Sequence, residues 1–289
     1  MFGGADLHSH STWSDGRDTP AQLAGKAVSA GLSVLALSDH DTLQGIAGFE
    51  EACARAGLVA VPAVELSARH RGEDAHVLGL FVDPAHEGFR ERLSGFRRER
   101  ARRGEGMVAR LSALGYPVDL EAILRAVGSG SFGRPHVARA LVEAKHVAGE
   151  DEAFTRFLER GGPAWLPKPK WEMVEAISSI RAAGGLAVLA HPFWHHDPEG
   201  VIRQGREAGL DGLEVSHSDH TGADEARFRG LARSLGLLPT AGSDHHGAPD
   251  GRRPVGCRRL GKDEWGALAE AAAARRAAAD RPALDLGPR

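Results

Sequence analysis

The sequence is poor in cysteine and tyrosine. Among its 289 residues are two cysteines, Cys53 and Cys257, and a single tyrosine, Tyr116. Two cysteines are too few for a disulfide framework or a thiolate zinc site. The charges nearly balance, with 36 Lys and Arg against 39 Asp and Glu and a formal net charge of -3. This balance argues against a chain that wraps nucleic acid through bulk electrostatics and leaves only a local basic patch for such binding.

Long hydrophobic runs are also missing. No run approaches the roughly 20 apolar residues that a membrane-spanning helix needs, and no basic segment followed by an apolar one marks a secretory signal at the start. We therefore expect a cytoplasmic protein that contacts no membrane and shows no sign of an obligate protein partner. A hydrophobic fraction of 42% and a charged fraction of 26% are typical of a globular chain with a sizeable core.

Short apolar runs alternate with helical patterns along much of the chain, which is typical of βα units. The runs lie at residues 5–7, 33–37, 58–66, 77–82, 186–190, 212–215 and 237–240, and the helical patterns lie at 20–30, 42–57, 172–183, 199–208, 223–235 and 263–279. This order predicts an α/β barrel, in which the carboxyl ends of the strands share one face.

The alternation stops between about residues 86 and 165, where only helical patterns occur, at 86–114, 119–127, 135–145 and 151–160. We therefore expect a barrel in two parts, 1–85 and 166–289, with an all-helical insertion at 86–165. An arginine cluster lies in the first of these helices: Arg97, Arg98, Arg100, Arg102 and Arg103. We interpret it as a solvent-exposed helix face paired with Glu99 and Glu105. The alternative is a patch that attracts an anionic polymer.

Histidine is the residue in excess, with 15 in the chain, and its positions follow the strands. Five apolar runs lead directly into possible metal ligands: His8 and His10, then Asp39, His40 and Asp41, then Glu65, then His191, and finally Asp244, His245 and His246. A single histidine after a strand is more often structural than a ligand. Because the pattern repeats at five strand ends that share one face, the sequence predicts a metal centre there.

The chemistry of the candidate ligands limits which metals can bind. Imidazole and carboxylate without thiolate suit Zn, Mn or Fe better than Cu(I) or an iron–sulfur cluster. With three or four protein ligands per ion, these residues would hold two or three ions, and Glu65 could bridge two of them. Such a centre suits hydrolysis of a phosphate ester, since one ion lowers the pKa of its bound water and another stabilises the leaving oxygen.

The motifs of the chain resemble those of the PHP (polymerase and histidinol phosphatase) family of metal-dependent phosphoesterases. The similar segments are A-D-L-H-S-H-S-T-W-S-D-G at 5–16, L-S-D-H-D-T at 37–42, P-A-V-E-L-S at 62–67, A-H-V-L-G-L at 75–80, L-A-H-P at 189–192 and G-S-D-H-H-G at 242–247. Two further segments, G-R-P-H-V-A-R-A-L-V-E-A at 133–144 and E-V-S-H-S-D-H-T at 214–221, resemble the branch that hydrolyses 3′,5′-nucleoside bisphosphates and short RNA.

The resemblance implies a distorted seven-stranded (β/α)7 barrel with up to three divalent or trivalent ions, Mn above all, with Zn or Fe as alternatives. It assigns His8, His10, Glu65 and Asp244 to the first ion, Glu65, His76 and His191 to the second, and Asp15, His40 and His246 to the third. No catalytic residue is expected apart from these ligands. Asp15 follows from the resemblance alone, because Ser-Asp-Gly is usually just a turn. His76 begins an apolar run instead of ending one, so we expect either that its strand runs against its neighbours or that the assignment fails.

The resemblance also implies substrate contacts. The helical insertion would bring Arg134 to a substrate phosphate, whose oxygens fit a planar guanidinium, and His136, His217 and His220 would lie on the substrate side. Two features depart from the branch. Phe193-Trp194-His195-His196 stands where the branch has Gly and a basic residue, and His245 fills an aromatic position, where it could compete for a metal.

These observations predict a phosphoesterase that uses a metal-bound hydroxide to remove the 5′-phosphate of AMP, a 3′,5′-nucleoside bisphosphate or the 5′ end of short RNA. The enzyme alternatives are a histidinol-phosphate-type phosphatase, a nuclease acting on longer chains, or hydrolysis of amides or amines on a metal-bearing barrel. A metal-loaded nucleotide- or RNA-binding module without catalysis is the remaining alternative.

Overall fold

A curved sheet forms the centre of the molecule. The computed structural model describes residues 2–128, 130–248 and 250–286. The strands are β1 Ala5–Asp6, β2 Val34–Leu37, β3 Val59–His70, β4 Glu73–Leu80, β5 Trp171–Glu172, β6 Leu186–Leu189, β7 Gly212–His217 and β8 Leu238–Gly242. They run in the order β1-β2-β3-β4-β6-β7-β8, and β5 pairs with β3 beside this path. Leu7 N–H donates to the Ala241 carbonyl at 3.0 Å, which joins the two ends of the sheet. The predicted α/β fold, a distorted seven-stranded barrel, is confirmed.

One strand runs against the others. The pairs β1–β2, β2–β3, β6–β7 and β7–β8 are parallel, whereas β4 is antiparallel to both β3 and β6. Strands β3 and β4 form a hairpin whose two-residue turn, Arg71 and Gly72, has positive φ at both positions, as a tight hairpin turn requires. The first of the two outcomes expected for the strand that carries His76 is therefore correct.

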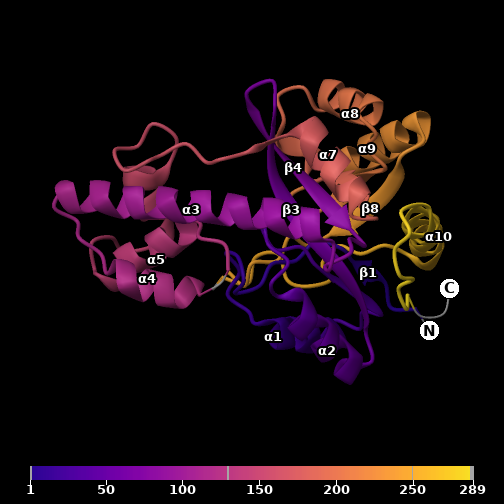
Figure 1. Cartoon of the computed structure of the whole chain (residues 1–289), viewed down its shortest axis with the longest axis horizontal. Helices are drawn as coiled ribbons and strands as arrows, with labels where there is room; N and C mark the ends of the chain where they lie inside the picture. Colours follow the sequence, from indigo (N-terminus) through magenta and orange to yellow (C-terminus); the bar gives the residue numbers. More distant parts are fainter. Residues whose placement is uncertain (1, 129, 249, 287–289) are drawn as a thin grey trace.

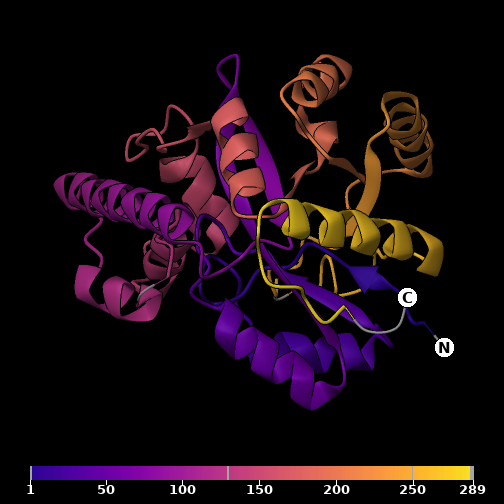
Figure 2. The same cartoon turned by 45° about the vertical axis from the view of Figure 1, so that its right-hand side comes forward.

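Helices cover the outside of the sheet. They are α1 Pro20–Ser29, α2 Ile46–Ala56, α7 Met173–Ala182, α8 Pro198–Glu207, α9 Gly222–Leu235 and α10 Lys262–Ala278. Local signals set their ends: Thr19 and Thr221 cap α1 and α9 with capping boxes, and Gly57 and Gly236 end α2 and α9 in the left-handed conformation. In Figure 2, α10 lies across the barrel on the side where the two chain ends meet.

A second group of helices projects from the barrel, to the left in Figure 1. It consists of α3 Glu87–Ala113, α4 Leu120–Val127, α5 Arg134–Glu143, α6 Glu150–Ala153 and a π-helical turn, Phe154–Leu158. These elements share their own hydrophobic cluster, which includes Met107, Leu111 and Phe132. Near its start, α3 packs Phe89 and Leu93 into a barrel cluster instead. The exact division at residues 86 and 165 stays a prediction.

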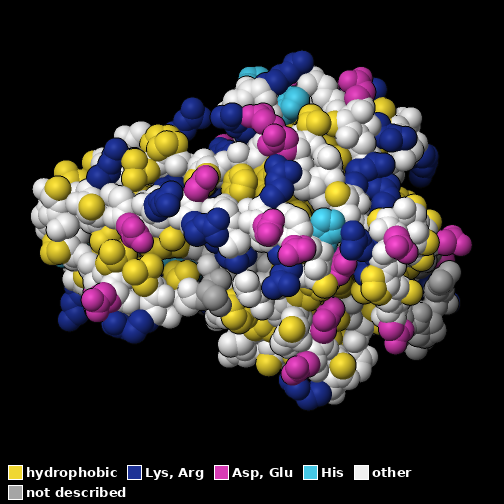
Figure 3. Space-filling view, in the orientation of Figure 1, with side chains coloured by type: hydrophobic (Ala, Val, Ile, Leu, Met, Phe, Trp, Pro, Cys, Tyr) yellow, Lys and Arg dark blue, Asp and Glu magenta, His cyan; other side chains and the backbone are white. Residues whose placement is uncertain are grey.

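The long helix α3 therefore connects the two parts. Its 27 residues extend over about 40 Å at 1.5 Å per residue. Lys and Arg side chains lie along α3 on the face drawn in Figure 3, where few histidine side chains are visible. Among the described residues no helix is long and apolar enough to cross a membrane.

Candidate active site

Side chains from the strand ends meet at one rim of the barrel. They comprise His8 and His10 after β1, His40 after β2, Glu65 within β3, His191 after β6, and Asp244 and His246 after β8. A parallel bridge between His40 and Glu65 holds the end of β2 against β3. Residues more than 200 positions apart in the sequence thus become neighbours, as the repeated strand-end pattern predicts.

Glu65 lies at the centre of this rim and is buried, with 1% of its surface exposed. Five imidazole rings surround its carboxylate. The shortest nitrogen–oxygen distances are 2.7 Å to His76, 3.0 Å to His40, 3.0 Å to His191, 3.3 Å to His10 and 3.5 Å to His8. Both carboxylate oxygens have nitrogen neighbours on different strands, so Glu65 is placed to bridge two ions.

Asp244 is a second centre on the same rim. Its carboxylate lies 3.2 Å from His10 Nε2, 3.3 Å from His8 Nε2, 3.3 Å from His217 Nε2 and 3.5 Å from His246 Nδ1. Asp244 has a φ of 52°, a conformation that costs a non-glycine residue on the order of 1 kcal/mol. Asp41 and His191, which also follow strands, share a positive φ, at 53° and 27°. Backbone strain is therefore present at three of the positions where strands deliver side chains to the rim.

Asp15 reaches the rim from the loop after β1. Its oxygens lie 3.3 Å from His246 Nε2, 3.7 Å from His40 Nε2 and 3.9 Å from His10 Nδ1. The preceding hydroxyl of Ser14 donates to Asp39, and the Arg139 guanidinium donates to the Asp15 carbonyl. These contacts fix a Ser-Asp-Gly turn that would otherwise face solvent.

His76 reaches the rim because β4 is reversed. It pairs with Ser67 in the β3–β4 register, near the start of β4, and the start of an antiparallel strand lies at the end of its neighbour. Its Nδ1 is 2.7 Å from Glu65 Oε1 and 3.3 Å from His191 Nε2. A ligand at the beginning of an apolar run is thus consistent with a rim built from strand ends.

The rim carboxylates stay ionised. Burial raises the pKa of Asp15, Glu65 and Asp244, but the surrounding histidines outweigh burial and hold each pKa well below its usual range. An ionised carboxylate is the form that binds metal.

The rim histidines divide into two groups. Burial lowers the pKa of His10, but hydrogen bonds to Asp244 and Glu65 outweigh it and raise that pKa to about 10. Burial prevails for His40, His76 and His191, whose pKa values are lowered. A lowered pKa favours the neutral ring, which can offer a lone pair, whereas His10 must lose a proton when a metal binds.

The residues present fit metal ions. Four groups place ligand atoms within 4.8 Å of one another: His10, Asp15, His40 and His246; His8, His217 and Asp244; His8, His10 and Glu65; and His40, Glu65 and His76. His10 Nδ1 is buried without a hydrogen-bond partner among the described residues. The Nε2 atoms of His8 and His10 lie 3.1 Å apart, within hydrogen-bond distance, so both rings point these nitrogens at the same part of the rim. Imidazole and carboxylate donors suit Mn, Zn or Fe.

Glu214 is a candidate functional residue that the strand-end pattern misses. It lies within β7, is fully buried, and contacts His8 Nδ1 at 2.9 Å and the His191 backbone N–H at 2.7 Å. It therefore orients two predicted ligands, as carboxylates behind metal-binding histidines often do. The sequence does contain a signal for this residue, which is an acidic side chain inside the apolar run 212–215.

A cavity of about 570 Å³ opens beside the rim. Its walls carry His40, His76 and His191 together with Arg100, Arg103, Arg134, Arg160 and Lys168. Burial, with Arg100 nearby, lowers the pKa of Lys168 to about 7, and burial beside Arg134 lowers the pKa of Arg103 to about 9. Crowded cations of this kind are stabilised by an anionic ligand. Lys168 was absent from the sequence prediction, since a lone lysine in a loop carries no signal.

The arginine cluster of α3 is only partly a solvent-exposed face. Arg98 and Arg102 are exposed, but Arg100 and Arg103 are buried. Arg100 forms an ion pair with Asp41 and also donates to the Phe132 carbonyl. The interpretation as a solvated face is therefore wrong for these two, because the helix turns them toward the barrel and the cavity.

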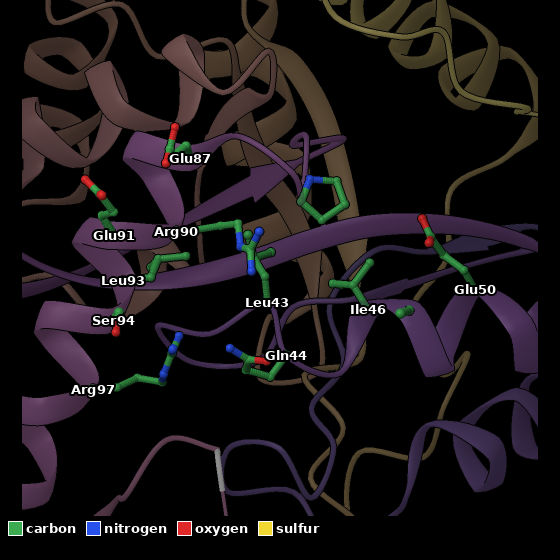
Figure 4. Close-up of a pocket in the computed structure, with 12 residues that line it drawn as sticks. Leu43, Gln44, Ile46, Glu50, Glu87, Arg90, Glu91, Leu93, Ser94 and Arg97 are labelled. Carbon is green, nitrogen blue, oxygen red and sulfur yellow. The ribbon is translucent and has the colours of Figure 1, made fainter.

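A second hollow, of about 610 Å³, lies between α3 and the start of α2. Figure 4 shows Glu87, Arg90 and Arg97 on α3 facing Gln44 and Ile46 across it. Among the described residues that line it there is no histidine, and its acidic and basic groups are mixed. It is therefore not the candidate active site.

Comparison with known proteins agrees with this geometry. Residues 6–110 match the PHP domain family. The chain is 34% identical over 268 residues to the 5′-3′ exoribonuclease Rnm of Salmonella typhimurium, covering 90% of this chain and 89% of that protein. The chain belongs to the PHP family. It is also 33% identical to the 3′,5′-nucleoside bisphosphate phosphatase of Chromobacterium violaceum, with 87% and 90% of the two chains covered.

Solved structures support the same assignment. A protein assigned as a metal-dependent phosphoesterase from Bifidobacterium adolescentis has a TM-score of 0.85 and 31% identity, with 93% of this chain and 96% of that chain covered. An amidohydrolase from Chromobacterium violaceum, solved with bound sulfate, has a TM-score of 0.83 and 30% identity over the same shares. As a PHP protein, this chain is a metal-dependent hydrolase of phosphate esters. The alternative of a non-catalytic binding module is thereby set aside.

Arg134 and His136, the two residues of the helical insertion that are predicted to contact substrate, lie in different places. Arg134 begins α5, lines the cavity and donates to the Leu158 carbonyl at 3.2 Å. His136 lines a separate hollow and accepts from Gly133 N–H at 3.1 Å through its Nδ1. The structure therefore brings Arg134, but not His136, to the wall of the cavity.

His217, the last residue of β7, and His220, just after it, lie close to the predicted ligands. His217 is fully buried, and its ring centroid is 5.5 Å from those of both His191 and His220. His220 uses Nδ1 to contact the Val215 carbonyl at 3.1 Å, while its Nε2 has no hydrogen-bond partner among the described residues. With Asp244 3.3 Å from its Nε2, His217 is placed as a further ligand as much as a substrate contact.

The structure also places the residues at which the sequence departs from the PHP branch. His245 contacts Asp18 at 2.7 Å and the Arg253 carbonyl at 2.8 Å, so both of its ring nitrogens are engaged outside the ligand groups. His195 and His196 line the cavity with Trp194. Burial lowers the pKa of His195 to about 4, which keeps this ring neutral.

Proposed function

We propose that this PHP phosphoesterase removes the 5′-phosphate from small nucleotides, such as AMP and 3′,5′-nucleoside bisphosphates, or from the 5′ end of short RNA. The observation that carries the proposal is the cationic cavity, which opens directly onto the histidine–carboxylate rim. An ester with one phosphate at the rim and further negative charge or a nucleoside in the cavity fits this arrangement.

We infer that the rim holds two or three ions. His8, His10, Glu65 and Asp244 would hold the first, Glu65, His76 and His191 the second, and Asp15, His40 and His246 the third. Bound there, the ions supply an activated water and neutralise charge on the phosphate. The identity of the metal, with Mn first, stays a prediction.

The residues of the chain position the substrate. Arg134 and Lys168 line the cavity beside the rim, where their charges would hold phosphate oxygens and orient the ester. Arg100 adds positive charge while remaining paired with Asp41. His217 and His220 remain candidates to contact the substrate or donate a proton to the leaving oxygen, and His136 would act through the start of α5.

A substrate panel tests the proposal. Phosphate release in the presence of Mn²⁺ is compared for AMP, adenosine 3′,5′-bisphosphate, a 5′-phosphorylated oligoribonucleotide and histidinol phosphate. A phosphoribosyl cyclic phosphate is added because a relative from Eggerthella lenta, 34% identical, is named a phosphoribosyl 1,2-cyclic phosphate 1,2-diphosphodiesterase. We expect the nucleotides to be hydrolysed fastest. Faster turnover of histidinol phosphate or of the cyclic phosphate would contradict the proposal.

A pair of variants tests the role of the cavity. Arg134→Gln removes a charge-assisted contact and is expected to raise the KM for AMP by about tenfold or more. The matched control is Arg125→Gln, since Arg125 is exposed on α4 and should leave KM unchanged. Equal kinetics for the two variants would exclude Arg134 from substrate binding.

A further inference from the structure

A tryptophan stands half-exposed in the wall of the cavity. Trp194 follows β6 in the short helical turn Pro192–Trp194 and has 51% of its surface exposed. It lines the cavity together with His191, His195 and His196. Its neighbour Phe193 is 47% exposed but is not part of this wall. A large aromatic side chain left open inside a polar cavity offers surface that a ligand can cover.

The position of the indole is fixed by its neighbours. Its ring centroid is 4.0 Å from that of His191, with 30° between the planes. The Arg253 guanidinium lies 5.7 Å from the indole centroid, and the His217 ring lies 5.8 Å away, edge-on. The indole thus packs directly on one of the rim histidines, within the reach of a nucleoside whose 5′-phosphate lies at the rim.

The rest of the cavity wall defines the other end of the ligand. Five Lys and Arg side chains line it, among them Arg103 and Arg134, against the three carboxylates of Asp15, Glu73 and Asp74. This excess of positive charge suits phosphate oxygens. The ligand that satisfies both kinds of wall has an anionic end and a flat, neutral, aromatic end. A nucleotide has this chemistry, whereas a sugar phosphate lacks the aromatic face.

We propose that Trp194 is the platform on which the base of the substrate stacks, so that it selects nucleotides over sugar phosphates. This inference rests on the proposed function and names the part of the site that determines specificity. Stacking on an aromatic side chain tolerates every base, so the platform selects for the presence of a base and not for its identity.

Paired substrates test the platform. The kinetics of wild type, Trp194→Ala and Trp194→Phe are measured with AMP and with ribose 5-phosphate, which has the same phosphate but no base. We expect Trp194→Ala to lower kcat/KM for AMP by about tenfold or more and to leave ribose 5-phosphate within about twofold. Trp194→Phe should retain part of the preference. Phe193→Ala, an equally exposed neighbour, should change neither substrate.

Two further measurements separate the possible failures. Equal losses for AMP and ribose 5-phosphate, or a lower metal content in Trp194→Ala, would mean that the indole only supports His191, and would overturn the inference. Binding of both compounds is also measured by calorimetry. If wild type hydrolyses neither compound, the proposed function fails. The platform is then judged by binding alone: a loss of affinity for AMP but not for ribose 5-phosphate in Trp194→Ala supports it. An unchanged affinity of Trp194→Ala for AMP overturns it.

Discussion

At the scale of single residues, the site depends on carboxylates that several histidines share. Glu65 has five imidazoles within 3.5 Å and 1% exposure, so its charge balances groups from strands β1, β2, β4 and β6. A buried charge with this many neighbours cannot be replaced by another group without rearranging them. Its removal should therefore affect the first and second ions directly, and the third through His40.

Glu65→Gln tests this central role. We expect metal content to fall below one ion per chain and phosphate release to fall by about 100-fold or more, because the amide offers a neutral oxygen in place of a bridging carboxylate. Elemental analysis and the phosphate assay measure the two effects. Glu51→Gln, an exposed change on α2, serves as the control. Full metal occupancy in Glu65→Gln would contradict the bridging role.

Lys168 gives the cavity a pH dependence. Its pKa is lowered to about 7, so its charge is present below this pH and is lost above it. We expect the KM for AMP to rise above about pH 7 in wild type, and Lys168→Arg to flatten the rise because arginine stays charged. Lys262→Arg, at the exposed start of α10, is the control. A KM profile that is the same in wild type and Lys168→Arg would contradict this role.

The same shift has a consequence for stability. An unfolded lysine has a pKa of about 10.4, so between about pH 7 and pH 10 the unfolded chain binds more protons at this position than the folded chain. The contribution of Lys168 to the free energy of unfolding therefore rises with pH across this window. The Lys168→Met variant should lose that dependence in urea unfolding.

The site residues that periodicity in the sequence could identify lie at strand ends, and two that it could not identify lie in loops. His8, His40 and His191 follow apolar runs, so periodicity alone predicts their convergence. Asp15 depends on a turn held by Ser14 and Arg139, and Lys168 depends on a loop that folds over the rim. Contacts made by loops are set by tertiary packing, which leaves no periodic signal in the sequence.

At the scale of elements, α3 links the helical part to the barrel. Phe89 and Leu93 pack into the barrel core, whereas Met107 and Leu111 pack among α4 and α5. Between these groups, Arg100 pairs with Asp41, the residue after His40, and both are buried. The ion pair thus fixes the insertion over the cavity next to a predicted ligand.

Removing this pair should cost stability. Arg100→Met leaves the Asp41 carboxylate buried without its partner, and we expect a loss of about 3–5 kcal/mol in the free energy of unfolding. Urea denaturation measures it, and Arg98→Met, an exposed change on the same helix, should be within about 0.5 kcal/mol of wild type. Adding Asp41→Asn should recover part of the loss. Equal stability of Arg100→Met and Arg98→Met would show that the ion pair is unimportant.

Element boundaries were predictable to within a few residues where helical signals were local, as at Pro20 and Gly57. The direction of β4 was left open, with a reversed strand as one of two expected outcomes, because an apolar run reads the same in parallel and antiparallel sheets. The dipeptide Arg71-Gly72 was the available signal, since a two-residue turn requires antiparallel strands.

At the scale of the whole molecule, metal binding and folding are coupled. The ligands come from both ends of the chain and from the strands between, so they converge only in the folded state. An ion that binds this state alone stabilises it by about 2.7 kcal/mol at a free concentration 100 times its Kd. The stability of the fold and the metal occupancy of the site are therefore expected to change together.

Metal removal tests this coupling. After dialysis against a chelator, we expect a lower Tm that Mn²⁺ restores in a concentration-dependent way. Acid should act in the same direction, because below about pH 6 protons compete with metal for histidine. Calorimetry or circular dichroism measures both. A Tm that does not change with metal would argue against ions at the rim.

The most direct test of the account is a crystal structure of the enzyme with AMP, in which anomalous scattering locates the ions. We predict at least two ions between Glu65 and the histidines of the rim, the 5′-phosphate between those ions and Arg134, and the base on Trp194. Fewer than two ions at the rim, or a phosphate bound away from it, would contradict the account.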